Sequence, residues 1–139
     1  MRTTAEVLAY VDTSALVKLV VDEPGSTELT VAVRDAELVA SALVRTELRR
    51  AAARHPDPRV LQRVEELLRT VALVAVDNNV LDRAGRLAPV SLRSLDALHV
   101  ATALSLGSAL DRVFTYDARM TAAVQLQGIE VHSPERPGS

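Results

Sequence analysis

The 139-residue sequence contains no cysteine, which excludes disulfides, zinc–thiolate sites and thiol nucleophiles. Aromatic residues make up only 2% of the chain, so a base-stacking platform for single-stranded nucleic acid is not expected. No apolar run approaches the roughly 20 residues needed to cross a bilayer, and the first residues lack the pattern of a signal peptide. We therefore expect a cytoplasmic protein that does not enter a membrane.

An excess of basic charge is also missing, because the formal net charge is −2 and the pI is about 5.9. This argues against binding nucleic acid by bulk charge alone, but not against an enzyme that acts on nucleic acid at a small local site. The five glycines are scattered, which excludes a dinucleotide-binding glycine cluster. What the chain does have, 48% hydrophobic and 24% charged residues, is typical of one globular domain with a real core.

Short apolar segments alternate with amphipathic ones along the whole chain. Strands are predicted at 8–11, 38–40, 71–76 and 112–116, with an edge strand at 129–131. Helices are predicted at 13–21, 27–35, 42–55, 59–69, 77–88, 95–106 and 117–127. This alternation predicts an α/β fold with a mostly parallel sheet, in which the valine-rich run 71–76 is typical of a strand covered on both faces. We expect a single domain over residues 1–133 and a flexible C-terminal tail over residues 134–139, which contains two prolines and a glycine.

Two aspartates directly follow predicted strands, where open α/β sheets bind their ligands. Asp12 follows 8–11, and because Thr13 and Ser14 are available to cap the next helix, we favour a site role for Asp12. Asp117 follows 112–116, and for it a helix-cap role and a site role are equally open. Asp77 has the same placement, but its strand is expected to be peripheral, and we interpret it as a cap only.

Two further acids lie on apolar helices. Glu47 falls on the stripe formed by Leu43, Val44, Leu48 and Ala51, so it points toward the sheet. Asp96 lies in the first turn of a helix that is apolar nearly all round. His99 shares the face of Asp96, and we interpret it as a core or structural hydrogen-bonding residue rather than a catalytic one. Burying a carboxylate without a partner costs several kcal/mol, so a cation is expected nearby.

Four carboxylates in one pocket would repel one another unless a cation were present. Oxygen ligands without cysteine favour Mg²⁺ or Mn²⁺, which lowers the pKa of bound water and neutralises charge on a phosphoryl group. We expect the hydroxyls of Thr13, Ser14 and Thr115 to orient carboxylates or waters. Lys18 is either a surface lysine with a buried stem or a contact to a substrate phosphate.

Four segments in series resemble the PIN domain, and in particular the VapC toxins of type II toxin–antitoxin pairs. They are Asp12-Thr-Ser-Ala-Leu-Val-Lys18, Ser41-Ala-Leu-Val-Arg-Thr-Glu47, Leu95-Asp96-Ala-Leu-His-Val-Ala-Thr-Ala103 and Phe114-Thr-Tyr-Asp117. The resemblance covers essentially the whole chain. It implies a three-layer α/β/α sandwich around a central, mostly parallel sheet of four to five short strands.

The same resemblance implies a Mg²⁺- or Mn²⁺-dependent endoribonuclease that hydrolyses RNA phosphodiester bonds with a metal-activated water. It assigns Asp12, Glu47, Asp96 and Asp117 as catalytic metal ligands, Asp117 being the least secure, with Thr115 in support. It further implies a homodimer and inhibition by a VapB-type antitoxin, whose basic side chain would fill the acidic pocket. Arg49, Arg50, Arg93 and Arg119 are unranked candidates for substrate choice.

Other functions fit the residues less well. A haloacid-dehalogenase-like phosphatase needs a second aspartate two residues after the first, and position 14 is serine. A receiver-type phosphoacceptor needs an acidic pair on the first strand, which is absent. The alternative that stays open is a non-catalytic PIN-like module whose acidic pocket receives a basic partner peptide.

Overall fold

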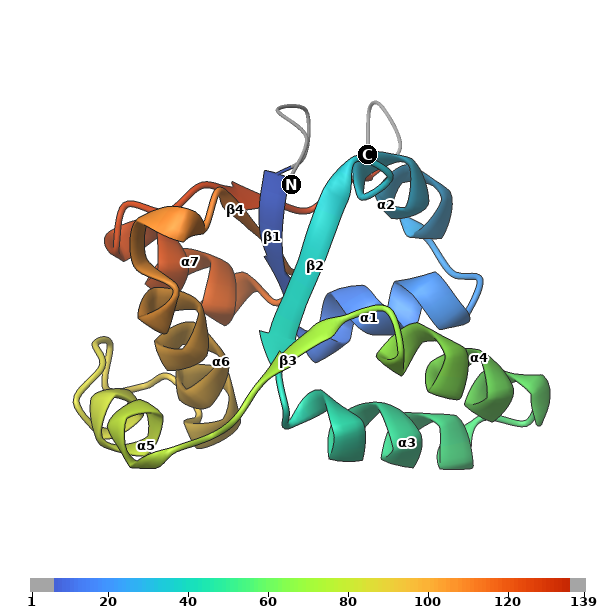
Figure 1. Cartoon of the computed structure of the whole chain (residues 1–139), viewed down its shortest axis with the longest axis horizontal. Helices are drawn as coiled ribbons and strands as arrows, with labels where there is room; N and C mark the ends of the chain where they lie inside the picture. The colour runs from blue at the N-terminus through green and yellow to red at the C-terminus, as the bar shows by residue number, and fades with distance from the viewer. Residues whose placement is uncertain (1–6, 136–139) are drawn as a thin grey trace.

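The computed structural model describes residues 7–135 and shows a sheet enclosed between two layers of helices (Figure 1). Its strands are β1 (Val7–Val11), β2 (Ala36–Ser41), β3 (Ala72–Val74), β4 (Arg112–Phe114) and β5 (Val131–His132). Its helices are α1 (Thr13–Val20), α2 (Ser26–Ala32), α3 (Val44–Arg54), α4 (Arg59–Leu68), α5 (Asn78–Gly85), α6 (Ser94–Ser105) and α7 (Ala118–Leu126), with a short 3₁₀ turn at Gly107–Ala109. The predicted α/β sandwich is confirmed, and the sheet has five strands.

The strand order is β3-β2-β1-β4-β5, and every pair of neighbours within the described residues is parallel. β1 is central, with the next strand in sequence, β2, on one side and β4 on the other. The chain therefore reverses its direction of travel across the sheet at β1. In open α/β sheets such a switch point leaves a crevice at the carboxyl ends of the two strands that flank it, here β1 and β4.

Both faces of the sheet are covered, as a parallel sheet requires. Because successive side chains of a strand point to opposite faces, Ala9 and Val11 of β1 join the core cluster against α1, α3 and α4. Tyr10 points the other way, into the cluster against α6 and α7. The two helical layers lie on either side of the sheet in Figure 1. Tyr10 and Asp12, two residues apart, thus belong to the same side.

The prediction for the valine-rich run was wrong in one respect. Only Ala72–Val74 of that run forms a strand, and β3 is an edge strand whose residues are exposed or half-buried rather than covered on both faces. An apolar run shows that a segment avoids water, but not how many neighbours it has in the sheet. The peripheral position that we expected for this strand is confirmed.

Two helix starts also differ from the prediction. Asp12 itself is the N-cap of α1, in place of Thr13 or Ser14, and accepts a hydrogen bond from the Ala15 N–H. α6 begins at Ser94, one residue before the predicted start, and has no side-chain cap. No helix in the described part of the chain is long and apolar enough to cross a membrane.

The predicted tail lies partly outside the described residues, since residues 136–139 are not among them. Within them, the carbonyl of Pro134 accepts a hydrogen bond from the Tyr116 hydroxyl at 2.6 Å. The domain boundary after residue 133 stays a prediction.

Candidate active site

Asp12 lies at the carboxyl end of β1 and is only 4% exposed. Both of its carboxylate oxygens are engaged. Oδ2 accepts from Thr115 Oγ1 at 2.6 Å, and Oδ1 accepts from Ser14 Oγ at 2.7 Å and from the Ala15 N–H at 3.0 Å. Burial raises the pKa of Asp12 above its usual value, although these three hydrogen bonds oppose the shift. The carboxylate is thus held in one orientation and favours proton or cation binding.

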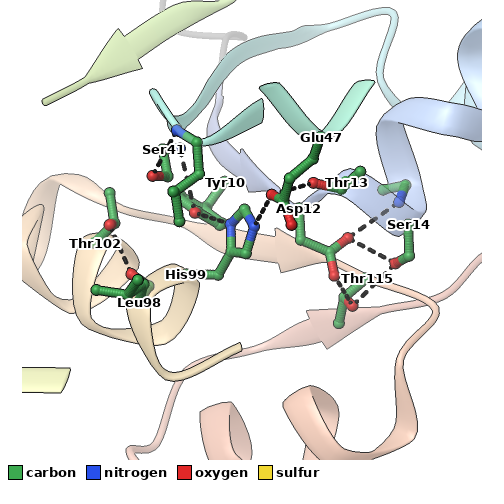
Figure 2. Close-up of polar contacts among 12 residues, drawn as sticks. Tyr10, Asp12, Thr13, Ser14, Ser41, Glu47, Leu98, His99, Thr102 and Thr115 are labelled. Atoms are coloured by element: carbon green, nitrogen blue, oxygen red, sulfur yellow. Dashed lines mark hydrogen bonds and ion pairs between the residues drawn. The ribbon is translucent and has the colours of Figure 1, made fainter. Parts of the chain in front are cut away.

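Glu47 reaches the same edge of the sheet from α3. Its Oε1 accepts from Thr13 Oγ1 at 2.7 Å and lies 2.8 Å from His99 Nε2, as Figure 2 shows. The side chain is 23% exposed. Burial acts to raise the pKa of Glu47, but the hydrogen bonds from His99 and Thr13 outweigh it and leave the pKa below its usual value. Glu47 is therefore an ionised acid that points inward, as the helix pattern predicted.

Asp96 and Asp117 line one pocket of about 290 Å³ together with Arg93, Ala118 and Arg119. Asp117 caps α7, where its Oδ1 accepts from the Met120 N–H at 2.8 Å. Burial raises the pKa of Asp96, and the neighbouring charges of Asp117 and Asp12 raise it further. The cap and site roles weighed for Asp117 are thus compatible, because the cap uses only one of its carboxylate oxygens.

The supporting hydroxyls lie where they join these acids. Thr115 donates to Asp12 and accepts from the Asp117 N–H at 3.1 Å, which links the ends of β1 and β4. Ser14 donates to Asp12 and accepts from the Tyr116 N–H at 2.9 Å. Thr13 contacts Glu47 instead. Hydrogen bonds from these hydroxyls therefore hold the carboxylates in place at the carboxyl ends of β1 and β4.

Asp96 and Asp117 line one pocket, and the charge of Asp12 acts on Asp96, but the acids do not form a preformed ion cage. Among residues 7–135, no three acidic or imidazole side chains lie close enough together to hold one metal ion. The donor chemistry still fits a hard divalent cation, because all four groups are carboxylates. Glu47 Oε2 and Asp117 Oδ2 accept no hydrogen bond from the described residues. Burial raises the pKa of both Asp12 and Asp96, and the charges of Asp117 and Asp12 raise that of Asp96 further, so a bound cation would stabilise their ionised forms.

With this geometry in place, comparisons with known proteins give a consistent answer. Residues 9–125 match the PIN domain family. The chain belongs to the PIN-domain family. Ribonuclease VapC46 of Mycobacterium tuberculosis is 43% identical over 132 residues, which cover 90% of this chain and 96% of that protein. Ribonuclease VapC47 of the same species is 34% identical over 132 residues, covering 91% and 97%. This PIN-domain chain is thus a VapC-type ribonuclease.

Solved structures support the fold of this PIN domain. The M. tuberculosis toxin VapC20, which cleaves the sarcin–ricin loop, matches with a TM-score of 0.69 at 18% identity over 83% of this chain and 94% of that one. A DNA-bound VapBC from Salmonella typhimurium gives a TM-score of 0.69 at 19% identity over 91% and 97%. At these identities the likeness establishes the architecture alone.

Two basic residues of this PIN domain, Lys18 and Arg49, already form ion pairs with glutamates. Lys18 Nζ binds Glu23 Oε1 at 3.1 Å and the Pro24 carbonyl at 2.7 Å, and lies 4.5 Å from the centre of the Tyr116 ring. It ties the end of α1 to the following turn, so the surface-lysine and phosphate-contact interpretations both missed its contacts. Arg49 is paired with Glu65 through two hydrogen bonds of 2.8 Å.

Two residues near the acids, His99 and Tyr10, form hydrogen bonds that the sequence did not indicate. The structural hydrogen-bonding interpretation of His99 is confirmed, but its bond to Glu47 was not foreseen. Tyr10 is one of only three aromatic residues in the sequence, and its hydroxyl lies 2.6 Å from His99 Nδ1. The available signal was the spacing of two between Tyr10 and Asp12 on a strand, which places both on one face.

Proposed function

We propose that this VapC-type ribonuclease hydrolyses RNA phosphodiester bonds as a Mg²⁺- or Mn²⁺-dependent endoribonuclease. As a VapC-type protein it is the toxin component of a type II toxin–antitoxin system. The observation that carries the proposal is the pocket that Asp96 and Asp117 line together with two arginines, at the sheet edge that also holds Asp12. Cellular RNA as the substrate places its action in the cytoplasm.

We assign Asp12 and Asp96 as the principal residues that would hold the ion, with Glu47 and Asp117 completing the set. When bound, such an ion supplies a water of lowered pKa and positive charge for a phosphoryl group. The protein's own contribution is orientation. Thr115 and Ser14 fix the carboxylate of Asp12 by hydrogen bonds of 2.6 and 2.7 Å, and Thr13 fixes that of Glu47 at 2.7 Å.

Arg93 and Arg119 are the arginines that we assign to RNA phosphates. Both are exposed and line the pocket that contains Asp96 and Asp117. Arginine recognises phosphate oxygens through its planar array of donors. Arg49 is a weaker candidate, because its guanidinium already binds Glu65.

The decisive experiment is cleavage of a mixed cellular RNA pool by the purified protein in Mg²⁺, in Mn²⁺ and in EDTA. We expect cutting with either metal, none in EDTA, and none by the Asp96→Asn variant. Asp77→Asn is the matched control, since Asp77 caps α5 in the same way that Asp117 caps α7 but lies outside the pocket. Cleavage by Asp96→Asn at the wild-type rate would refute the site, and no cleavage by the wild type would favour the binding-module alternative.

We further propose a homodimer inhibited by a VapB-type antitoxin. The acidic pocket suits an arginine of the antitoxin, which would supply the positive charge that a metal otherwise brings. The cognate antitoxin should then stop cleavage, and calorimetry should show weaker binding to a variant carrying both Asp96→Asn and Asp117→Asn. Sedimentation of the purified toxin tests the dimer.

A further inference from the structure

Four elements each contribute one group to a buried chain of hydrogen bonds that ends on Glu47 (Figure 2). The Ser41 N–H at the end of β2 donates to Tyr10 Oη at 3.2 Å. Tyr10 Oη on β1 lies 2.6 Å from His99 Nδ1 on α6, and His99 Nε2 lies 2.8 Å from Glu47 Oε1 on α3. Tyr10 is 0% and His99 3% exposed, so water does not compete for these bonds.

One assignment of donors satisfies every polar group along this chain. A tyrosine phenol carries a single proton at neutral pH and can donate only one hydrogen bond. The Tyr10 oxygen already accepts from the Ser41 amide, and Thr102, the neighbouring hydroxyl, donates to the Leu98 carbonyl at 2.7 Å. The phenol proton therefore goes to His99 Nδ1. The remaining ring nitrogen, Nε2, then carries the proton that it donates to the Glu47 carboxylate.

The hydrogen bonds at Glu47 connect this buried chain of hydrogen bonds to the candidate metal site. Both of its donors, His99 Nε2 and Thr13 Oγ1, bind the same oxygen, Oε1. Oε2 accepts no hydrogen bond from the described residues. Two donors on one oxygen restrict the orientation of the carboxylate and leave the other oxygen available to a ligand, as outer hydrogen-bond partners do for metal-binding carboxylates elsewhere.

We propose that Tyr10 and His99 are positioning residues for Glu47. Together they form a relay, anchored on the Ser41 amide, that fixes the Nε2–H tautomer of His99. The relay also leaves Glu47 Oε2 to bind a divalent cation. The cation part rests on the proposed function, whereas the tautomer part does not. The sequence offers no other imidazole here, because His55 and His132 belong to other segments. Burying an imidazole and a phenol is costly unless both are hydrogen-bonded, and this chain satisfies each group.

The tautomer is read directly by long-range ¹⁵N–¹H NMR of uniformly ¹⁵N-labelled protein without metal. The wild type should show His99 with a protonated Nε2 and an unprotonated Nδ1. In Tyr10→Phe, which removes the donor to Nδ1, the Nδ1 resonance should move to that of a nitrogen without a hydrogen bond, while the Glu47 carboxylate keeps the proton on Nε2. A wild-type His99 protonated on Nδ1, or an unchanged spectrum in Tyr10→Phe, would overturn the relay.

The effect on the cation is measured by calorimetric titration with Mn²⁺ alone. His99→Leu should bind Mn²⁺ about 10-fold more weakly than the wild type. His99→Gln should recover most of the affinity, because its side-chain amide can donate to Glu47, and Tyr10→Phe should show a smaller loss than His99→Leu. Equal Mn²⁺ affinity in the wild type and a folded His99→Leu would refute the positioning role.

Two controls separate this inference from the proposed function. Tyr116→Phe removes the other tyrosine hydroxyl, which donates to Pro134 outside the relay, and should leave Mn²⁺ affinity unchanged. Asp96→Asn should lose Mn²⁺ binding while retaining the His99 tautomer. If the wild type bound no Mn²⁺, the metal site would fail, and the NMR comparison with Tyr10→Phe would still decide the relay.

Discussion

Asp96 differs from Asp12 in that no hydrogen bond to the described residues offsets the burial of its carboxylate. Its folded-state pKa lies above the usual 3.8, because of burial and then the charge of Asp117. The folded protein therefore binds more protons than the unfolded chain, and Asp96 lowers stability increasingly as the pH rises above 3.8. In EDTA, Asp96→Asn should be more stable than the wild type at pH 7, and the difference should vanish as the pH falls toward 3.8.

Urea unfolding across this pH range measures the effect, and Asp57→Asn provides a control of opposite sign. The hydrogen bond from Arg59 lowers the pKa of the half-buried Asp57 to about 2. That carboxylate contributes stability above its unfolded pKa of 3.8, and this contribution is lost as the pH falls toward 2. Asp57→Asn should thus be slightly less stable than the wild type at pH 7. Destabilisation at pH 7 by both variants would contradict the account of Asp96.

Local patterns in the sequence select the four acids as a candidate site, which stays a prediction, but they could not give the hydrogen-bond partners of these acids. Strand ends and helix stripes are local patterns, and they selected Asp12, Glu47, Asp96 and Asp117. The contact between His99 on α6 and Glu47 on α3 joins residues 52 apart in the sequence. It depends on how two helices meet at the sheet edge, which no local pattern encodes.

The helices α5 and α7 begin alike, with an aspartate that accepts a hydrogen bond from the N–H three residues on, yet only one start belongs to the pocket. Asp77 accepts from Val80 at 2.9 Å and Asp117 accepts from Met120 at 2.8 Å. Either Asp→Ala variant should lose about 1 kcal/mol of stability, because alanine cannot cap a helix. Asparagine caps as well as aspartate, so neither Asp→Asn variant should lose stability.

RNA cleavage then separates the two helix starts. Asp117→Asn should cut RNA more slowly than the wild type although its helix is intact, whereas Asp77→Ala should cut normally although α5 is weakened. Thermal unfolding and cleavage assays on the four variants provide the measurement. Wild-type cleavage by Asp117→Asn would reduce Asp117 to a cap and remove it from the ligand set.

The fold as a whole followed from the alternation of apolar runs and amphipathic helices, since that alternation leaves few topologies. The central position of β1 could be expected from Asp12, but the length of β3 could not. The length of β3 is set by its pairing with β2, and this pairing extends only over Val39–Ser41 of β2. Edge geometry is a property of the assembled sheet.

A chain with a net charge of −2 must hold RNA through a few local contacts rather than a basic surface. Each phosphate contact to a single strand contributes about 0.7 to the slope of log affinity against log salt concentration. Replacing Arg93 and Arg119 together by glutamine should therefore weaken binding and reduce that slope by about 1.4. Fluorescence anisotropy with a labelled RNA that the toxin cleaves, in metal-free buffer, measures the slope without turnover.

The matched control replaces Arg83 and Arg86 by glutamine. These two arginines line a separate pocket beside α5. It removes the same two positive charges, so both double variants carry a formal net charge of −4 against −2 for the wild type. If affinity depended only on the overall charge of the molecule, the two would lose binding equally. A smaller slope confined to the Arg93 and Arg119 variant would locate the RNA backbone at the pocket that holds Asp96 and Asp117, because counterions are released only where phosphates are neutralised.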